Sequence, residues 1–251
     1  MGDVPHQDGL APGAGGRLIE ELAPETIELP DGALELLQPL ESAELPDDGG
    51  VEWAPIVPYW SVLWRSGVAL ARELEHLDLR GVRVVELGCG LGVPSLAAAR
   101  AGARVLATDS EPQALELLAL NAERNGARLE TALVDWAAPR ELLERGAFDL
   151  ALAADVLYER QSVAPLLALL PRLAPRAWIA DPGRPAAEAF LEGAAARAWR
   201  IGADVRGVVR IYRMELADRA ATGSPFVEPG EENTIAPSSI GPWRSTRMSR
   251  G

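Results

Sequence analysis

The chain has 251 residues, 48% of them hydrophobic, and a formal net charge of −13 in which every basic residue is arginine. This length suits one well-cored α/β domain, and no apolar run reaches the roughly 18–20 residues that cross a bilayer. The charge makes nucleic acid a poor partner and a basic protein surface a better one. The single cysteine, Cys89, excludes an internal disulfide and a thiolate zinc site, and the first residues lack an apolar signal segment. We therefore expect a cytoplasmic protein without a metal.

The part of the chain before residue 81 is irregular in composition. Residues 1–17 are rich in glycine and proline and are expected to be disordered. Residues 18–80 are expected to form a small N-terminal extension, in which several prolines forbid one long helix, followed by a helix capped near Ser66. Trp60 and Trp64 are four residues apart, so we expect them to share one face of a helical turn, as core or as part of a site.

From residue 81 to residue 217, predicted strands and helices alternate. Strands are predicted at 82–87, 104–108, 129–134, 148–153 and 177–180, with a closing pair across 200–216 that Gly202 and Gly207 divide. Helices are predicted at 94–101, 111–125, 161–173 and 186–199. This alternation predicts a single doubly wound, Rossmann-like α/β domain with a mostly parallel seven-stranded sheet. Residues 218–251 lack periodicity and are expected to form a disordered tail.

A glycine loop follows the first of these strands, with the sequence Glu86-Leu87-Gly88-Cys89-Gly90-Leu91-Gly92. Glycines let the backbone approach a ligand, and Asp109 at the end of the next strand can accept two ribose hydroxyls, which fits NAD or S-adenosylmethionine (SAM). The third glycine comes one residue earlier than in the dinucleotide pattern, with Val93 in its place. Glu86 would repel a pyrophosphate and attract the cationic SAM, so SAM is the predicted cofactor.

Asp135 and Trp136 follow the third strand of this series. An indole can pack against an adenine, and a neighbouring acid can accept a hydrogen bond from its amine. The alternative is a solvent-exposed acid beside a core tryptophan. At this position downstream of the glycine loop, the cofactor-binding interpretation is favoured.

Several motifs between Leu22 and Leu216 are shared with one known group of enzymes. These motifs are Pro58-Tyr59-Trp60 with Trp64 and Gly67, the glycine loop, Asn121 with Asn125-Gly126, Asp155-Val156-Leu157-Tyr158, and Asp181-Pro182-Gly183-Arg184-Pro185. With them the chain resembles the class I seven-strand SAM-dependent methyltransferases. Within that class it resembles the electron-transfer-flavoprotein β-subunit lysine methyltransferases and their bacterial relatives, which are often described as predicted nicotinamide N-methylases.

The resemblance implies roles for residues outside the glycine loop. It places Trp64 beside the methionine part of SAM, and it makes Asp155 and Tyr158 the candidate catalytic residues that hold a lysine side chain. The alternative for the latter pair is a helix-capping acid and a packing tyrosine. Asp181 and Arg184 either form an ion pair that fixes their turn or contact the substrate.

Three functions remain open at this point. The first is a SAM-dependent methyltransferase, expected to be a monomer, that modifies a lysine of a protein partner. The second is an N-methyltransferase of a small amine or a nicotinamide-like molecule. The third is a SAM-binding fold that has lost catalysis and serves as an interaction module.

Overall fold

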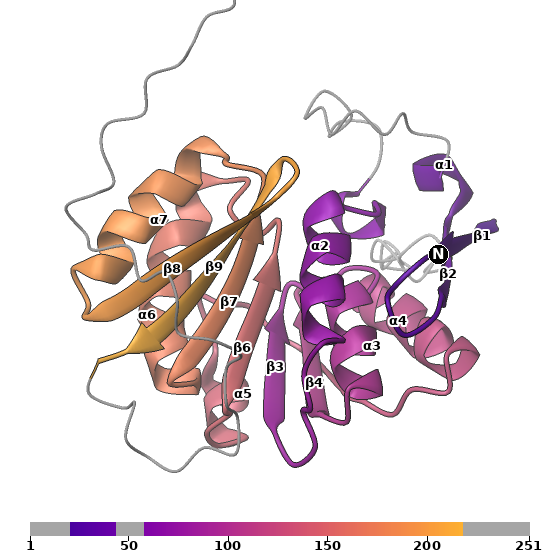
Figure 1. Ribbon diagram of the computed structural model, residues 1–251, viewed down its shortest axis with the longest axis horizontal. Coiled ribbons are helices and arrows are strands. Elements are labelled where there is room, and N and C mark those ends of the chain that lie inside the picture. The colour runs from indigo at the N-terminus through magenta and orange to yellow at the C-terminus, as the bar shows by residue number, and fades with distance from the viewer. Residues whose placement is uncertain (1–20, 44–57, 218–251) are drawn as a thin grey trace, which may run out of the picture.

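The computed structural model describes residues 21–43 and 58–217 (Figure 1). The disorder predicted for residues 1–17 and 218–251 falls outside these ranges. Within them, no helix combines the length and the apolar character that crossing a membrane requires.

The described residues form a seven-stranded sheet with the strand order β5-β4-β3-β6-β7-β9-β8 (Figure 1). Its strands are β3 (Arg83–Leu87), β4 (Arg104–Asp109), β5 (Glu130–Leu133), β6 (Leu150–Ala154), β7 (Arg176–Asp181), β8 (Trp199–Arg206) and β9 (Val209–Leu216). The first five run parallel, whereas β9 is antiparallel to both β7 and β8. This confirms the predicted mostly parallel sheet. Of the two glycines predicted to divide the closing strand pair, Gly207, with φ +64°, lies in the turn between β8 and β9, whereas Gly202 lies inside β8.

Helices cover both faces of this sheet. They are α2 (Arg65–Leu74), α3 (Val93–Arg100), α4 (Pro112–Arg124), α5 (Arg140–Glu144), α6 (Val163–Leu173) and α7 (Pro185–Ala195). The first three share one hydrophobic cluster with one face of the sheet, and the last three share a second cluster with the other face. The short helix α5 was not predicted from the sequence.

The segment before α2 differs from the prediction. Tyr59–Ser61 forms a short 3-10 turn, and α2 begins at Arg65 with Trp64 as its N-cap residue rather than near Ser66. The backbone at Val62 and at Trp64 is extended, with ψ 137° at each. The extended stretch separates Trp60 from Trp64, so the expectation that they share a helical turn was wrong.

The N-terminal extension is a hairpin of β1 (Leu22–Ile27) and β2 (Leu34–Pro39), followed by α1 (Leu40–Ala43). Leu34 and Leu36 of β2 are fully buried in the same cluster as α2, α3 and α4. In Figure 1 the hairpin lies beside α4, away from the central strands. The predicted small N-terminal element is therefore a hairpin packed on the main domain.

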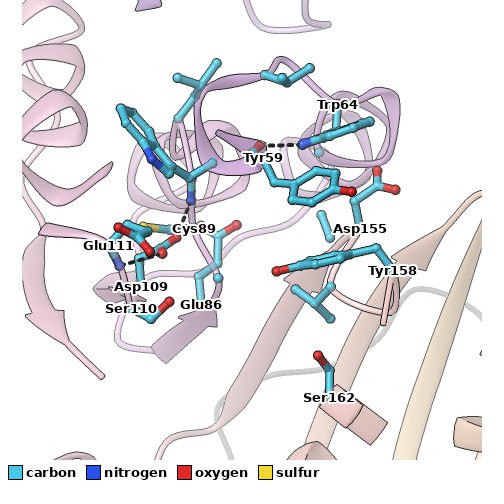
Figure 2. Close-up of a pocket in the computed structure, with 18 of the residues that line it drawn as sticks. Tyr59, Trp64, Glu86, Cys89, Asp109, Ser110, Glu111, Asp155, Tyr158 and Ser162 are labelled. Carbon is cyan, nitrogen blue, oxygen red and sulfur yellow. Dashed lines mark hydrogen bonds between the residues drawn. The ribbon is translucent and has the colours of Figure 1, made fainter. Parts of the chain in front are cut away.

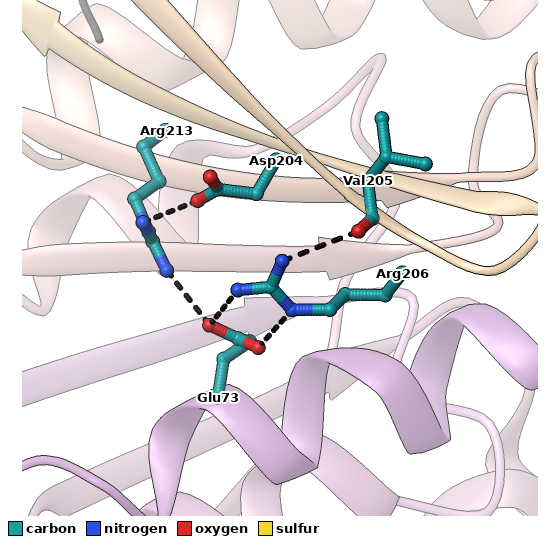
Figure 3. Close-up of polar contacts among 5 residues, drawn as sticks. All are labelled: Glu73, Asp204, Val205, Arg206 and Arg213. Atoms are coloured by element: carbon teal, nitrogen blue, oxygen red, sulfur yellow. Dashed lines mark hydrogen bonds and ion pairs between the residues drawn. The ribbon is translucent and has the colours of Figure 1, made fainter. Parts of the chain in front are cut away.

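Ion pairs tie α2 to the last two strands (Figure 3). Glu73 of α2 accepts hydrogen bonds from Arg206 at 2.6 and 3.2 Å and from Arg213 at 2.8 Å. Arg213 also pairs with Asp204 and lies 4.6 Å from the centre of the buried Trp178 ring. Because Glu73 is mostly buried and bonded to two guanidinium groups, this network holds α2 more firmly than an isolated surface pair does.

Candidate functional site

The glycine loop leaves the end of β3 in a conformation that favours glycine. Gly88, Gly90 and Gly92 have φ values of +71°, +49° and +81°. A Cβ atom on Gly90 would lie 2.9 Å from the carbonyl oxygen of Trp60, and one on Gly92 would lie 2.1 Å from Leu118 Cδ1. The glycines therefore have two effects: they allow backbone angles that would be strained for other residues, and they let neighbouring elements approach the loop closely.

The second of these effects predicts a stability difference. We expect Gly92→Ala to lower the free energy of unfolding by about 1–3 kcal/mol more than Gly81→Ala, the typical cost of overpacking. Gly81 has a similar φ of +85° but nothing within 4 Å of its would-be Cβ, so it carries the backbone strain without the contact with Leu118. Urea unfolding of both variants measures the difference. Equal losses would show that the packing of Gly92 against α4 contributes nothing.

Asp109, the last residue of β4, holds this loop in place. Its Oδ2 accepts a hydrogen bond from the Gly90 amide at 2.9 Å, and its Oδ1 accepts one from the Glu111 amide at 3.1 Å. Burial raises the pKa of the Asp109 carboxyl, while these amides oppose the shift. Each carboxylate oxygen can accept a further bond, so two hydroxyl donors on neighbouring carbons fit this acid.

Glu86 lies in the next-to-last position of β3 and is fully buried. Its Oε2 accepts a short hydrogen bond from the Ser95 hydroxyl of α3. Burial raises the pKa of Glu86 to about 8, and the neighbouring Asp109 adds to the shift. A buried acid that stays protonated at neutral pH is stabilised as a carboxylate when a cation binds beside it.

Cys89 of the same loop is buried and free. Burial raises the pKa of its thiol well above the ordinary value, and the carboxyls of Asp109 and Glu86 raise it further. A buried thiol with a raised pKa is a poor nucleophile, so this residue serves to fill space in the loop. Residues 21–43 and 58–217 contain no cluster of three or more His, Cys, Asp or Glu side chains that could hold a metal ion.

Asp135 and Trp136 follow the end of β5 and line the same cavity as the glycine loop. A Cβ atom on Gly88 would lie 3.4 Å from the Trp136 ring, so the indole reaches the glycine loop. Trp136 is half-buried, and Asp135 is exposed and accepts a hydrogen bond from the Ala137 amide at 2.8 Å. The arrangement presents an indole and an acid to the cavity beside the loop.

The far end of the site is built after β6. Asp155 is a non-glycine residue with φ +57°, and its side chain is 4% exposed. Its Oδ1 accepts hydrogen bonds from Arg184 at 2.6 and 3.2 Å. The Arg184 guanidinium also lies 5.3 Å from the centre of the Trp64 ring. A strained acid with a buried ion pair at the edge of a cavity is typical of functional positions.

Two tyrosines meet beside this acid (Figure 2). The rings of Tyr59 and Tyr158 are 4.8 Å apart and tilted by 31°, and Trp64 donates a hydrogen bond to the Tyr59 carbonyl at 2.9 Å. Burial raises the pKa of Tyr158, with the nearby Glu159 adding to the shift. Because its pKa rises above an already alkaline ordinary value, Tyr158 is a neutral phenol at physiological pH.

All ten site residues predicted from the sequence line one cavity of about 780 Å³. They are Trp64, Glu86, Gly88, Gly90, Gly92, Asp109, Asp135, Trp136, Asp155 and Tyr158. The structure brings them together, and their individual roles stay predictions. Sequence reasoning named Tyr59 within a shared motif but gave it no role, and it missed Ser95, because a serine in an alanine-rich helix carries no signal of its own.

Of the two alternatives considered for Asp181 and Arg184, the ion pair between their side chains is not the contact that these residues make. Asp181 Oδ1 instead accepts hydrogen bonds from the backbone amides of Gly183 and Arg184 at 2.6 and 2.7 Å. The Arg184 side chain pairs with Asp155. Hydrogen bonds from backbone amides to Asp181 thus fix the turn, and the Arg184 guanidinium pairs with Asp155 at the cavity.

Comparisons with known proteins agree with this geometry. Residues 60–177 match the family described as lysine methyltransferase. The chain is 37% identical over 120 residues to the protein N-lysine methyltransferase METTL21A of Danio rerio, covering 45% of this chain and 55% of that protein. It is 34% identical over 140 residues to the human electron transfer flavoprotein beta subunit lysine methyltransferase, covering 53% and 52%.

Two solved structures have a fold similar to that of this chain. The ribosomal protein L11 methylase of Lactobacillus delbrueckii superposes with a TM-score of 0.52 at 18% identity, covering 61% of this chain and 80% of that one. The 16S rRNA methyltransferase RsmC of T. thermophilus gives 0.57 at 16% identity, covering 77% and 50%. At these identities the likeness shows the fold. The chain spans about half the length of the curated relatives that it matches.

Proposed function

We propose that this chain binds SAM and transfers its methyl group to the side chain of a protein lysine. The observation that carries the proposal is one cavity with two chemically different ends. Buried acids surround a glycine loop at one end, and Asp155 lies with the paired tyrosines at the other. The names of the relatives, which are lysine methyltransferases, support the same reaction.

The residues at the loop end fit SAM part by part. Glu86 is placed to hold the ammonium group, and Asp109 to accept the two ribose hydroxyls. Trp136 and Asp135 are placed to hold the adenine, and Trp64 to pack beside the methionine part. When bound, SAM supplies an electrophilic methyl group on a positively charged sulfur.

The raised pKa of Glu86 predicts that SAM binding depends on pH. Below a pKa of about 8 the free protein carries a protonated Glu86, and a cation beside it favours the carboxylate, so binding releases a proton. The affinity is therefore expected to rise with pH, by up to about tenfold per pH unit, and to level off above the pKa. Calorimetry in buffers of different ionisation enthalpy measures both the affinity and the released proton.

Glu86→Gln is the matched control for this prediction. It keeps the shape of the side chain and removes the ionisable group, so any remaining pH dependence belongs to SAM itself. Equal pH profiles for wild type and Glu86→Gln would contradict the proposed contact between Glu86 and the ammonium group.

At the other end of the cavity, we propose that Asp155 orients the attacking amine. Arg184 occupies Oδ1 of Asp155, which leaves Oδ2 to accept a hydrogen bond from the substrate. A lysine must lose its proton before it attacks, and the nearby guanidinium charge disfavours the protonated amine. Tyr158 lines the path of the amine with its ring and phenol, and water takes up the proton. The chain's part in the reaction is mainly alignment, as an in-line displacement requires.

The proposal is tested by incubating the purified protein and tritiated SAM with a bacterial lysate, followed by gel fluorography and acid hydrolysis of any labelled band. We expect a labelled protein whose hydrolysate contains methylated lysine. The protein itself has no lysine, so its own band cannot contribute that product. Label confined to small molecules would overturn the lysine assignment in favour of a small amine. Failure of SAM to bind by calorimetry would overturn the proposal as a whole.

A further inference from the structure

Two asparagines of α4 bind the backbone of the N-terminal hairpin. Asn121 Oδ1 accepts a hydrogen bond from the Leu37 amide at 2.6 Å, and its Nδ2 donates one to the Leu37 carbonyl at 3.1 Å. Asn125 makes the same pair of contacts with the amide and carbonyl of Glu35, at 2.9 and 2.7 Å. The two side-chain amides thus satisfy one edge of β2 as a neighbouring strand does, while β1 pairs with the other edge.

Only Asn121 also reaches the glycine loop. Its Nδ2 donates a second hydrogen bond to the carbonyl of Leu91 at 3.3 Å, and the residue is fully buried. The additional bond of Asn125 goes to the Asn121 carbonyl of its own helix, at 2.7 Å. One turn earlier on α4, Leu118 packs against Gly92 of the loop. The face of α4 that carries residues 118, 121 and 125 therefore runs from the loop to the hairpin.

We propose that Asn121 is a positioning residue that couples docking of the N-terminal hairpin to cofactor binding, an inference that rests on the proposed function. One amide group holds Leu37 and Leu91 at once. The two contacts with Leu37 fix the orientation of the Asn121 side-chain amide, and the amide in this orientation holds Leu91 of the glycine loop. The residue before Leu91 is Gly90, whose backbone amide donates a hydrogen bond to Asp109. Loss of the hairpin leaves the amide free to rotate away from Leu91. Because coupling between two sites is reciprocal, cofactor binding in turn favours the docked hairpin.

Asn121→Ala and Asn125→Ala form a matched pair that tests this inference. Each variant loses two hydrogen bonds to β2, but only Asn121→Ala loses the bond to the loop. We expect Asn121→Ala to weaken SAM binding by roughly fivefold to hundredfold, the usual range for coupled sites. Asn125→Ala is expected to bind SAM nearly as the wild type does, because the contacts of Asn121 with Leu37 and the burial of β2 still hold the hairpin. Calorimetry with SAM gives the affinities, and thermal melting without SAM shows that both variants are folded.

The outcomes separate this inference from the proposed function. Equal affinities of the two variants, whether both unchanged or both reduced alike, overturn the role of Asn121 while SAM binding by the wild type stands. A wild-type protein that does not bind SAM overturns the proposed function, and this inference falls with it.

A measurement on the wild type keeps the test valid if Asn121→Ala does not fold. Hydrogen exchange of the Leu37 amide, which donates to Asn121, is expected to slow by several-fold when SAM is added, since binding stabilises the docked hairpin. The amides of β8, which lie at the opposite end of the chain's fold from the hairpin, serve as the control (Figure 1). Unchanged exchange at Leu37 in the presence of saturating SAM overturns the coupling.

Discussion

Replacing Asp155 by asparagine is expected to lower the rate of methyl transfer by about 100-fold or more, the effect of misplacing a reacting group by about 1 Å. The amide keeps the size of the side chain, and asparagine tolerates the left-handed backbone found here, with φ +57°. The substitution removes the negative charge that pairs with Arg184 and that we propose to accept a hydrogen bond from the amine. Initial rates of tritium incorporation into the lysate proteins measure the effect.

SAM affinity should stay close to that of the wild type in this variant, because Asp155 lies at the opposite end of the cavity from the acids that we propose to hold the cofactor. Glu188→Gln makes the same chemical change at an exposed position on α7 that does not line the cavity, and we expect it to retain the wild-type rate. Full activity of Asp155→Asn would remove Asp155 from the mechanism.

Replacing Asp109 by alanine is expected to weaken SAM binding by about 100-fold or more. A hydrogen bond to a charged group contributes about 1.5–3 kcal/mol, and about 1.4 kcal/mol corresponds to a factor of ten in affinity. The variant loses the proposed acceptors for the two ribose hydroxyls together with the hydrogen bonds that Asp109 accepts from Gly90 and Glu111. Calorimetry with SAM gives the change directly.

Asp109→Asn is the graded control for that experiment. Its side-chain carbonyl still accepts the Gly90 amide while one acceptor and the charge are lost, so we expect an intermediate affinity. Thermal melting without SAM separates a local effect from unfolding. An alanine variant that binds SAM like the wild type would place the ribose elsewhere.

The central strands and the glycine loop could be predicted because their signals are local. Mostly apolar segments such as Val82–Leu87, where only Arg83 and Glu86 are charged, predict buried parallel strands, and the glycines that follow mark the turn into a helix. The antiparallel strands β8 and β9 were harder to predict. Gly202 interrupts the apolar pattern of β8 without ending the strand, since antiparallel pairing with β9 holds the backbone there.

Partners that are distant in the sequence could not be predicted. Arg184 lies three residues from Asp181, yet it pairs with Asp155, which is 29 residues away, because the backbone of the turn already uses Asp181. The hairpin was predicted only as a small N-terminal element. The outer edge of β2 is bonded to two asparagines on α4, which lie 84 and 90 residues further along the chain. Two asparagines at helical spacing do not by themselves indicate that they replace a strand.

The strand order has a consequence for how this protein folds as it is synthesised. β9 is inserted between β7 and β8, so β8 emerges from the ribosome before the strand that joins it to the sheet. Until Val209–Leu216 is available, one edge of β7 stays unpaired and exposes backbone groups that can pair with other chains. Most of the cavity residues precede β7, but the network on Glu73 that braces α2 requires Arg206 and Arg213. The wall of the cavity formed by α2 is therefore completed only after the rest of the site has been made.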